Sequence, residues 1–240
     1  MKNKLFFKRA LCLSNRHKAR TQKGMELDMS YITVVNATKT IKKNRVLSDI
    51  NLELEKGKIY GFHGRNASGK TMLFRAVSGL IGLSEGEITV DGKTIGKDCE
   101  FPESMGLIIE TVNLWNHLTG FENLKQLASI QNKITDERIE EAMLEIGLEP
   151  GDGKKYKKYS LGMKQKLAIA QAIMEHPDLI ILDEPTNSLD AESVENLKAA
   201  VIKENKRGAT ILIASHIFDD LKELCHEIFQ MDCGKISGKM

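Results

Sequence analysis

The stretch GRNASGKT, residues 64–71, decides the fold of this chain. It follows a compact apolar run, KIYGFH at 58–63, which predicts a buried strand, and it precedes KTMLFRAVSGL at 70–80, which has the pattern of a helix. Glycines and small residues at a strand-to-helix turn let backbone N–H groups point inward, where they hold phosphate oxygens. The pattern G-x-x-x-x-G-K-[ST] in this context predicts a phosphate-binding loop, and a chance match in a glycine-rich turn is the alternative.

Two side chains of this loop have chemical roles in the prediction. Lys70 would reach the β- and γ-phosphates of a nucleotide, and the hydroxyl of Thr71 would bind Mg²⁺. Ala67 stands at a position where glycine is frequent, which costs little if its φ is negative. The predicted nucleotide-binding residues of this segment are Gly64, Arg65, Asn66, Ala67, Ser68, Gly69, Lys70, Thr71 and Met72.

A second apolar run, residues 179–182, predicts another buried strand, which ends at Asp183 and Glu184. Asp183 would lie at the sheet edge, where it can hold Mg²⁺. Glu184 would then accept a proton from an attacking water. For this segment alone, a simple Asp-Glu turn after a strand is the alternative. Together with residues 64–71, it indicates a Mg²⁺-dependent P-loop nucleotide hydrolase.

Between these motifs lies YSLGMKQKL, residues 159–167. Ser-x-Gly before a helix suits a second phosphate clamp, because it combines a hydroxyl, a close backbone and a positive helix end; an ordinary helix N-cap is the alternative. At 23 residues before Asp183, the segment resembles the LSGGQ signature of ABC transporter nucleotide-binding subunits. Leu161 stands in the first Gly position and Met163 in the Gln position. The form YSxGMKQ is similar to the branch that exports bacteriocins, lantibiotics and antibiotics.

Other elements of the family pattern follow in order. Residues 188–190, SLD, match the D-loop, and His216, after ATILIAS, matches the switch histidine that contacts the γ-phosphate. Glu110 stands where most of the family has a glutamine; it cannot donate a hydrogen bond as Gln does, but its carboxylate can face Mg²⁺ or water. Ile41 occupies roughly the place of the aromatic residue that stacks on adenine, so the stacking is reduced.

The resemblance implies a division of roles within the site. Glu184 and His216 would be catalytic, and Thr71 and Asp183 would hold Mg²⁺. The nucleotide contacts outside the phosphate loop would come from Ser160, Gly162 and Glu110.

The pattern of strands and helices predicts an α/β fold with a parallel sheet and crossover helices. YITVVNAT and VLSDINLELEKG read as short alternating strands, and FDDLKELCHEI, residues 218–228, as a helix. The resemblance, which spans about residues 31–236, implies an ABC-type ATPase core with a mixed sheet, an N-terminal antiparallel β sub-domain and an inserted α-helical sub-domain at about 113–160. Leu114, Trp115 and Leu118 could dock a membrane partner or belong to the core.

Composition is ordinary for a globular chain of 240 residues, with 41% hydrophobic and 28% charged residues. The net charge of +2 hides an asymmetry, since residues 1–24 hold eight Lys/Arg and no acid while the rest carries −6. We interpret residues 1–29 as a disordered basic extension ahead of an ATPase domain at 30–240; a membrane-surface helix, or an upstream start before Met25 or Met29, are the alternatives. Four cysteines without a CxxC pair indicate a reducing cytosol.

The resemblance implies an ATP-binding, ATP-hydrolysing subunit that uses ATP and Mg²⁺. No apolar run approaches the roughly 18 residues that span a bilayer, so its transmembrane permease would be a separate chain. Two ATPase subunits, identical or different, would close head-to-tail on two ATP molecules at the cytoplasmic side of the membrane. We expect export of peptide or antibiotic-like cargo and no nucleic-acid partner. A soluble ABC ATPase not coupled to transport and a weakly hydrolysing immunity or regulatory module are the alternatives.

Overall fold

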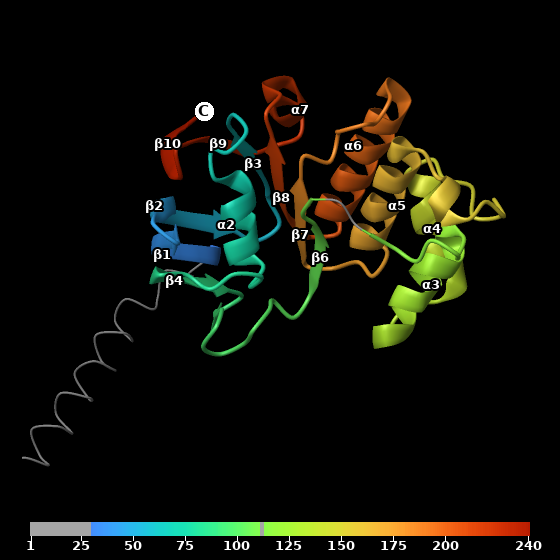
Figure 1. The fold of residues 1–240 in the computed structure, drawn as a ribbon, viewed down its shortest axis with the longest axis horizontal. Coiled ribbons are helices and arrows are strands. Elements are labelled where there is room, and N and C mark those ends of the chain that lie inside the picture. Colours follow the sequence, from blue (N-terminus) through green and yellow to red (C-terminus); the bar gives the residue numbers. More distant parts are fainter. Residues whose placement is uncertain (1–29, 111–112) are drawn as a thin grey trace, which may run out of the picture. The chain divides into compact units, whose positions relative to one another are not determined.

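The structure, a computed structural model, describes residues 30–110 and 113–240 (Figure 1). The predicted basic extension, residues 1–29, lies outside the described residues, as do Thr111 and Val112. Within the described ranges, no helix has the length and apolar character needed to cross a membrane.

The strands form two sheets. The N-terminal sheet has the order β2-β1-β4-β5, and β4 runs antiparallel to both β1 and β5. Its strands are β1 (Ser30–Ile41), β2 (Asn44–Glu55), β4 (Glu85–Val90) and β5 (Lys93–Thr94). The larger sheet has the order β10-β9-β3-β8-β7-β6, and its neighbouring strands are parallel except β9 with β10. Its strands are β3 (Ile59–His63), β6 (Met105–Ile108), β7 (Leu179–Asp183), β8 (Thr210–Ser215), β9 (Glu227–Asp232) and β10 (Lys235–Lys239).

The helices are α2 (Lys70–Val77), α3 (Gly120–Gln131), α4 (Asp136–Glu145), α5 (Leu161–Ile173), α6 (Ala191–Lys206) and α7 (Phe218–Lys222), with a 3₁₀ turn η1 (Tyr156–Lys158). Three of the helices, α3, α5 and α6, begin at a capping side chain. Thr119 and Glu122 form a capping box at the start of α3, because each side chain accepts the other residue's backbone N–H. Ser160 and Asp190 cap α5 and α6 in the same position.

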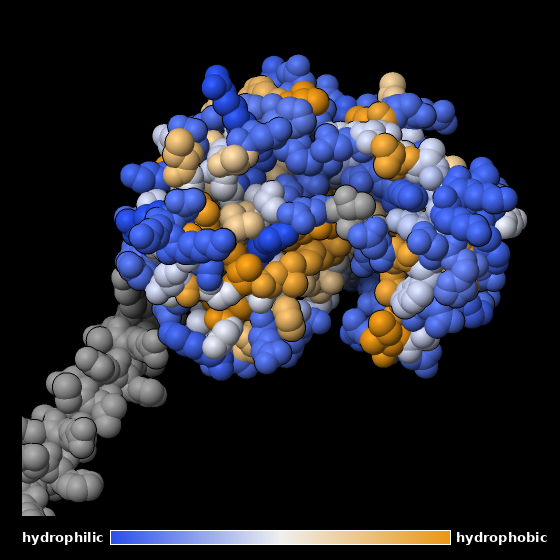
Figure 2. All heavy atoms as spheres, viewed as in Figure 1, coloured by the Kyte–Doolittle hydropathy of each residue, from blue (hydrophilic) through white to orange (hydrophobic). Residues whose placement is uncertain are grey.

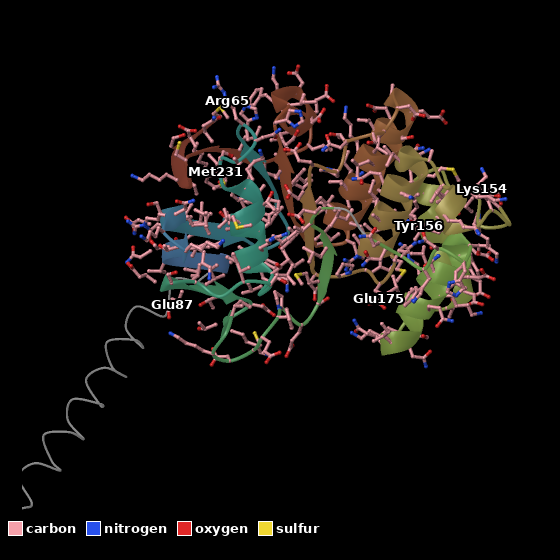
Figure 3. All side chains as sticks on the ribbon, in the orientation of Figure 1. Arg65, Glu87, Lys154, Tyr156, Glu175 and Met231 are labelled. Atoms are coloured by element: carbon pink, nitrogen blue, oxygen red, sulfur yellow. The ribbon has the colours of Figure 1, made fainter. Side chains whose placement is uncertain are left out.

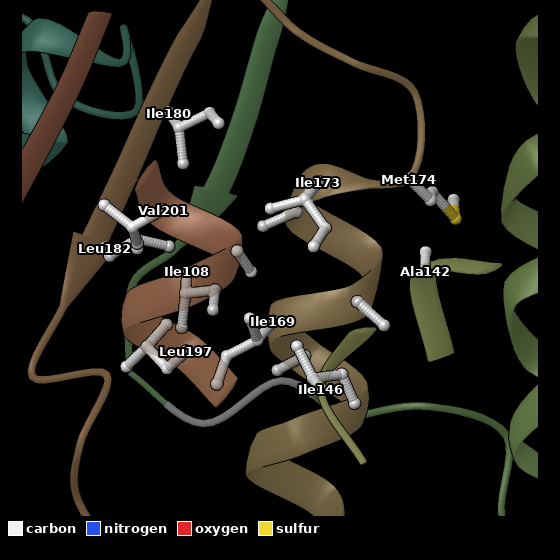
Figure 4. Packing of buried hydrophobic residues seen from close by; sticks show 14 of the residues in the cluster. Ile108, Ala142, Ile146, Ile169, Ile173, Met174, Ile180, Leu182, Leu197 and Val201 are labelled. Carbon is white, nitrogen blue, oxygen red and sulfur yellow. The ribbon is translucent and has the colours of Figure 1, made fainter. Parts of the chain in front are cut away.

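Alternating side chains of the larger sheet build two cores. In β7, Ile180 and Leu182 point to one face, while Leu179 and Ile181 point to the other, as a period of two requires. The first pair packs against α5 and α6, where Ile173 and Leu197 contribute (Figure 4). The second pair joins the core shared by α2 and the N-terminal sheet. Burial on both faces explains why residues 179–182 of β7 are all apolar.

The expected α/β architecture with a mixed sheet is confirmed, but two details were wrong. β1 and β2 are 12 residues each rather than short. The segment 218–228 is not one helix, because α7 ends at Lys222 and Glu227 begins β9. β9 pairs with the open edge of β3, and Ile228 and Phe229 are buried on opposite faces of the sheet. Strand pairing therefore overrides the local helical pattern at this point.

Candidate functional site

The predicted phosphate-binding loop connects β3 to α2. The ammonium group of Lys70, whose side chain is 5% exposed, donates to the carbonyls of Gly64 at 2.5 Å and Arg65 at 3.3 Å. A side chain at Gly64 would collide with the Met231 carbonyl and the Ser68 hydroxyl. The loop thus curls tightly around Lys70, and its glycines are required by close backbone contacts.

Ala67 has a φ of 63°, so the condition of a negative φ, under which alanine would cost little, is not met. Its backbone lies in the left-handed region, where a Cβ atom crowds the following carbonyl and costs about 1–2 kcal/mol. The substitution of a frequent glycine by alanine is therefore a source of strain in this loop.

Thr71 and Asp183, the predicted Mg²⁺ ligands, lie side by side. The Thr71 hydroxyl donates to Asp183 Oδ2 at 2.6 Å. Asp183 is 8% exposed, and burial, together with the negative charges of Glu184 and Glu110, raises the pKa of its carboxyl group. The hydrogen bond from Thr71 acts in the opposite direction. A carboxylate whose ionised form is disfavoured in this way is stabilised by a nearby cation.

Glu184, the predicted general base, lies between the side chains of His216 and Lys70. His216 Nδ1 is 2.7 Å from Glu184 Oε2, and the Lys70 ammonium is 3.4 Å from Oε1. The backbone N–H of His216 also donates to Oε2 at 3.3 Å. Glu184 has a φ of 50°, an uncommon conformation for this residue type. The structure therefore brings together both residues predicted to be catalytic, with Lys70 beside them.

Glu110 lies at the same cleft, but its carboxylate is held by a residue that the sequence did not single out. Arg75 Nη2 is 2.7 Å from Glu110 Oε1, and the Glu110 side chain is 62% exposed. Arg75 lies four residues after Thr71 in α2, so the two side chains lie on the same face of the helix. This spacing could have pointed to Arg75 from the sequence. Glu110, Thr71, Asp183 and Glu184 line a cleft of about 350 Å³.

The signature residues lie at the start of α5. The Ser160 hydroxyl accepts the N–H of Met163 at 3.2 Å, so the helix-cap role is present in the structure. A Cβ at Gly162 would be 2.8 Å from the Ser188 carbonyl, which places this turn against the D-loop of the same chain. Leu161 between them is 72% exposed. Ser160 thus has a structural function, and its phosphate contact stays a prediction.

The predicted residues outside the central cleft differ in how exposed they are. Ile41 ends β1 and is 42% exposed. Leu114 packs against the core, whereas Trp115 is 45% exposed and its backbone N–H donates to Asn123 Oδ1. Leu118 is half-buried.

The residues present fit a nucleotide with Mg²⁺. Three of the buried side-chain oxygens that lack a hydrogen-bond partner within the described part of the chain lie at this site: Ser68 Oγ, Asp183 Oδ1 and Glu184 Oε1. Buried oxygens of this kind are normally satisfied by water, ions or ligands. No cluster of three or more His, Cys, Asp or Glu suited to a metal ion occurs among the described residues, so a Mg²⁺ ion held by Thr71 and Asp183 would also need phosphate oxygens.

The fold and site define a P-loop nucleotide hydrolase, and comparisons give its family. The ABC transporter family model matches residues 47–187. The ATP-binding protein YybJ of Bacillus subtilis (strain 168) is 48% identical over 85% of this chain and 94% of its own length. The bacitracin transport ATP-binding protein BcrA of Enterococcus faecalis is 36% identical over 85% of this chain and 67% of its own. The lantibiotic transport ATP-binding protein SrtF of Streptococcus pyogenes is 31% identical over 85% and 88%.

The dimeric structure of MJ0796, a bacterial ABC transporter cassette, has a similar fold, with a TM-score of 0.79 at 23% identity over 87% of this chain and 97% of that chain. The chain belongs to the ABC transporter family as an ATP-binding subunit, and it is an ATPase.

Proposed function

We propose that this ATPase drives export of a peptide or antibiotic-like cargo through a separate transmembrane permease, from the cytoplasmic face of the membrane. The observation that carries this proposal is the similarity to BcrA and SrtF, which are named as bacitracin and lantibiotic transport proteins. The YSLGMKQ signature points to the same branch.

Within one subunit, Lys70, Thr71, Asp183, Glu184 and His216 would serve one ATP. Lys70 would bind the phosphates, Thr71 and Asp183 would hold Mg²⁺, and Mg²⁺ when bound would offset the phosphate charge. Glu184 would take the proton of the attacking water, while the 2.7 Å contact with His216 orients its carboxylate. Ser160 and Gly162 would complete the site of a second ATPase subunit, so that ATP favours a closed dimer and hydrolysis opens it.

Substitution Glu184→Gln tests the proposed closing of the dimer by ATP. It removes the proton acceptor but leaves the shape of the site and the phosphate contacts of Lys70, so the variant should bind ATP, fail to hydrolyse it and accumulate as a dimer. Light scattering at saturating ATP measures the association. A variant that stays monomeric under these conditions rules out the closing dimer of identical subunits.

For the permease, we propose docking on the apolar face between α2 and β6 (Figure 2). Leu80 and Phe101 are 50% and 47% exposed, and the half-buried Ile81, Leu107 and Ile109 pack over the core next to them. An exposed apolar surface of this kind commonly marks a protein contact.

Leu80→Glu should abolish co-purification of a multi-helix membrane protein from detergent extracts and any stimulation of ATPase activity by that partner, without changing basal hydrolysis. Ile130→Glu, at a 77% exposed position of α3, is the matched control. Equal recovery of the partner with both variants would place its docking site elsewhere.

A further inference from the structure

We propose that the turn between β9 and β10, residues 232–235, supports the phosphate loop from behind, and that Gly234 is a positioning residue for ATP binding. This inference concerns the ATPase site alone and does not depend on the cargo, the permease or dimer closure.

Both backbone groups of Gly234, its N–H and its carbonyl, are hydrogen-bonded. Its backbone N–H donates to the carbonyl of Ser68 in the phosphate loop at 2.8 Å. Its own carbonyl accepts the N–H of Ser48 in β2 at 2.9 Å. Gly234 therefore links the phosphate loop to the N-terminal sheet through consecutive backbone groups.

The hydrogen bond from the Gly234 N–H to the Ser68 carbonyl sets the direction of the next backbone N–H in the phosphate loop, that of Gly69. In a trans peptide the C=O and the following N–H point in opposite directions, and the described residues contain no cis peptide. Because the Ser68 carbonyl is held toward Gly234, the N–H of Gly69 must point away from the turn. This N–H has no acceptor among the described residues. It is thus oriented as an N–H of an anion-binding nest should be.

Backbone packing holds the same arrangement. A Cβ at Gly69 would be 3.0 Å from Gly234 Cα, and one at Gly64 would collide with the Met231 carbonyl. Figure 3 labels Arg65 on the phosphate loop and Met231 on the neighbouring β9. The loop therefore rests directly on main-chain atoms of β9 and the turn, without an intervening side chain that could yield.

Gly234 itself cannot be replaced without movement of this support. Its φ of 74° lies in the left-handed region. A Cβ there would be 2.5 Å from the Val46 carbonyl oxygen and 3.2 Å from Leu47 Cα. Since both of these atoms belong to the backbone of a paired strand, the turn itself would have to shift away from β2. Its hydrogen bond to the Ser68 carbonyl would be displaced as well.

Gly234→Ala tests the inference, with Gly92→Ala as the matched control. Gly92 has nearly the same φ, 75°, in the β4–β5 turn, but a Cβ there meets nothing within 4 Å. Both substitutions add left-handed strain, and only Gly234→Ala displaces the support of the phosphate loop. We expect the Kd for Mg·ATP, measured by calorimetry, to rise about tenfold or more in Gly234→Ala and to stay unchanged in Gly92→Ala.

A hydrogen-bond deletion without a new side chain provides the second variant. Cys233 directly precedes Gly234, so ligation of a synthetic peptide for residues 233–240 can replace the Gly234 N–H by an ester oxygen in the full chain. This ester should also weaken ATP binding, while the same exchange at Gly238 of β10 should not. The all-peptide ligation product is the reference.

The inference is overturned by wild-type ATP affinity in Gly234→Ala, by an equal loss in Gly92→Ala, or by an ester at position 234 that leaves the Kd unchanged. If Gly234→Ala does not fold, the ester decides. Loss of ATP-driven dimers or of permease coupling with an unchanged Kd would bear on the proposed transport function instead.

Discussion

Ala67 is the residue at which the phosphate loop is strained, because its φ of 63° suits glycine better than alanine. Ala67→Gly should raise the free energy of unfolding by about 0.5–1 kcal/mol, since relief of left-handed strain exceeds the extra entropy that glycine loses on folding. Urea denaturation measures the change. Ala142→Gly, inside α4, is the control and should lower stability by about 1 kcal/mol or more. A less stable Ala67→Gly variant would contradict the explanation.

Asp183 illustrates a conflict between stability and chemistry at a single residue. Burial raises the pKa of its carboxyl group, so the folded protein binds the proton more tightly than the unfolded chain does, and ionisation at neutral pH destabilises the fold. Asp183→Asn should therefore raise the melting temperature of the nucleotide-free protein at pH 7. The gain should vanish as the pH falls through the raised pKa, where Asp183 becomes neutral as well.

The same variant should lose Mg²⁺-dependent ATP hydrolysis by about a hundredfold or more, because a predicted ligand is gone. Thermal scans between pH 4 and 8 and phosphate-release assays provide the two readouts. An Asp183→Asn protein that is less stable at pH 7 would show that the Thr71 hydrogen bond outweighs burial.

At the scale of elements, Arg138 ties α4 to the end of α5. Its guanidinium pairs with Glu145 at 2.6 Å and with Glu141 at 3.0 Å, and Nε donates to the Met174 carbonyl at 3.1 Å. Arg138→Met should destabilise the protein by about 2 kcal/mol, since the Met174 carbonyl loses its side-chain donor and the Glu145 carboxylate keeps only Lys203. Lys125→Met removes an exposed pair with Asp136 and should change stability by less than about 0.5 kcal/mol.

The effect of Arg138 should depend on pH. Hydrogen bonds from Lys203 and then Arg138 lower the pKa of Glu141 from 4.5 to about 2. A lowered carboxyl pKa contributes stability above the unfolded value, and that stability is lost as pH falls toward the folded value. The difference in melting temperature between wild type and Arg138→Met should thus shrink from pH 4.5 to pH 2. A constant difference over this range would assign the loss to packing alone.

At the scale of the whole molecule, Leu161 is an exposed residue between two predicted phosphate contacts. In the proposed dimer, Ser160 and Gly162 face the ATP of the other subunit, so Leu161 would be buried on closure. Leu161→Glu should reduce steady-state hydrolysis about tenfold or more without changing the Kd for ATP. Leu144→Glu, at a 58% exposed position of α4, should hydrolyse ATP normally. Equal activity of the two variants would remove Leu161 from the interface.

The parts of the site that are contiguous in the chain could be predicted from the sequence. The phosphate loop is one strand-turn-helix segment, and Asp183 with Glu184 ends one apolar strand, so local patterns were enough. Arg75, the β9 strand and the left-handed φ of Ala67 were missed. The Arg75–Glu110 pair and the β9 strand depend on contacts between residues distant in sequence, and the periodicity of 218–228 gave the opposite answer for β9.

The sequence by itself determined the class of protein and predicted which residues could bind phosphate, because both follow from residue types at fixed local spacings. Only the tertiary structure decided how the phosphate loop is held. Pairing of β9 with β3 brings Met231 and Gly234 behind Gly64 and Gly69, across more than 160 residues of chain. Such contacts depend on backbone positions in three dimensions, and no pattern of neighbouring residues encodes them.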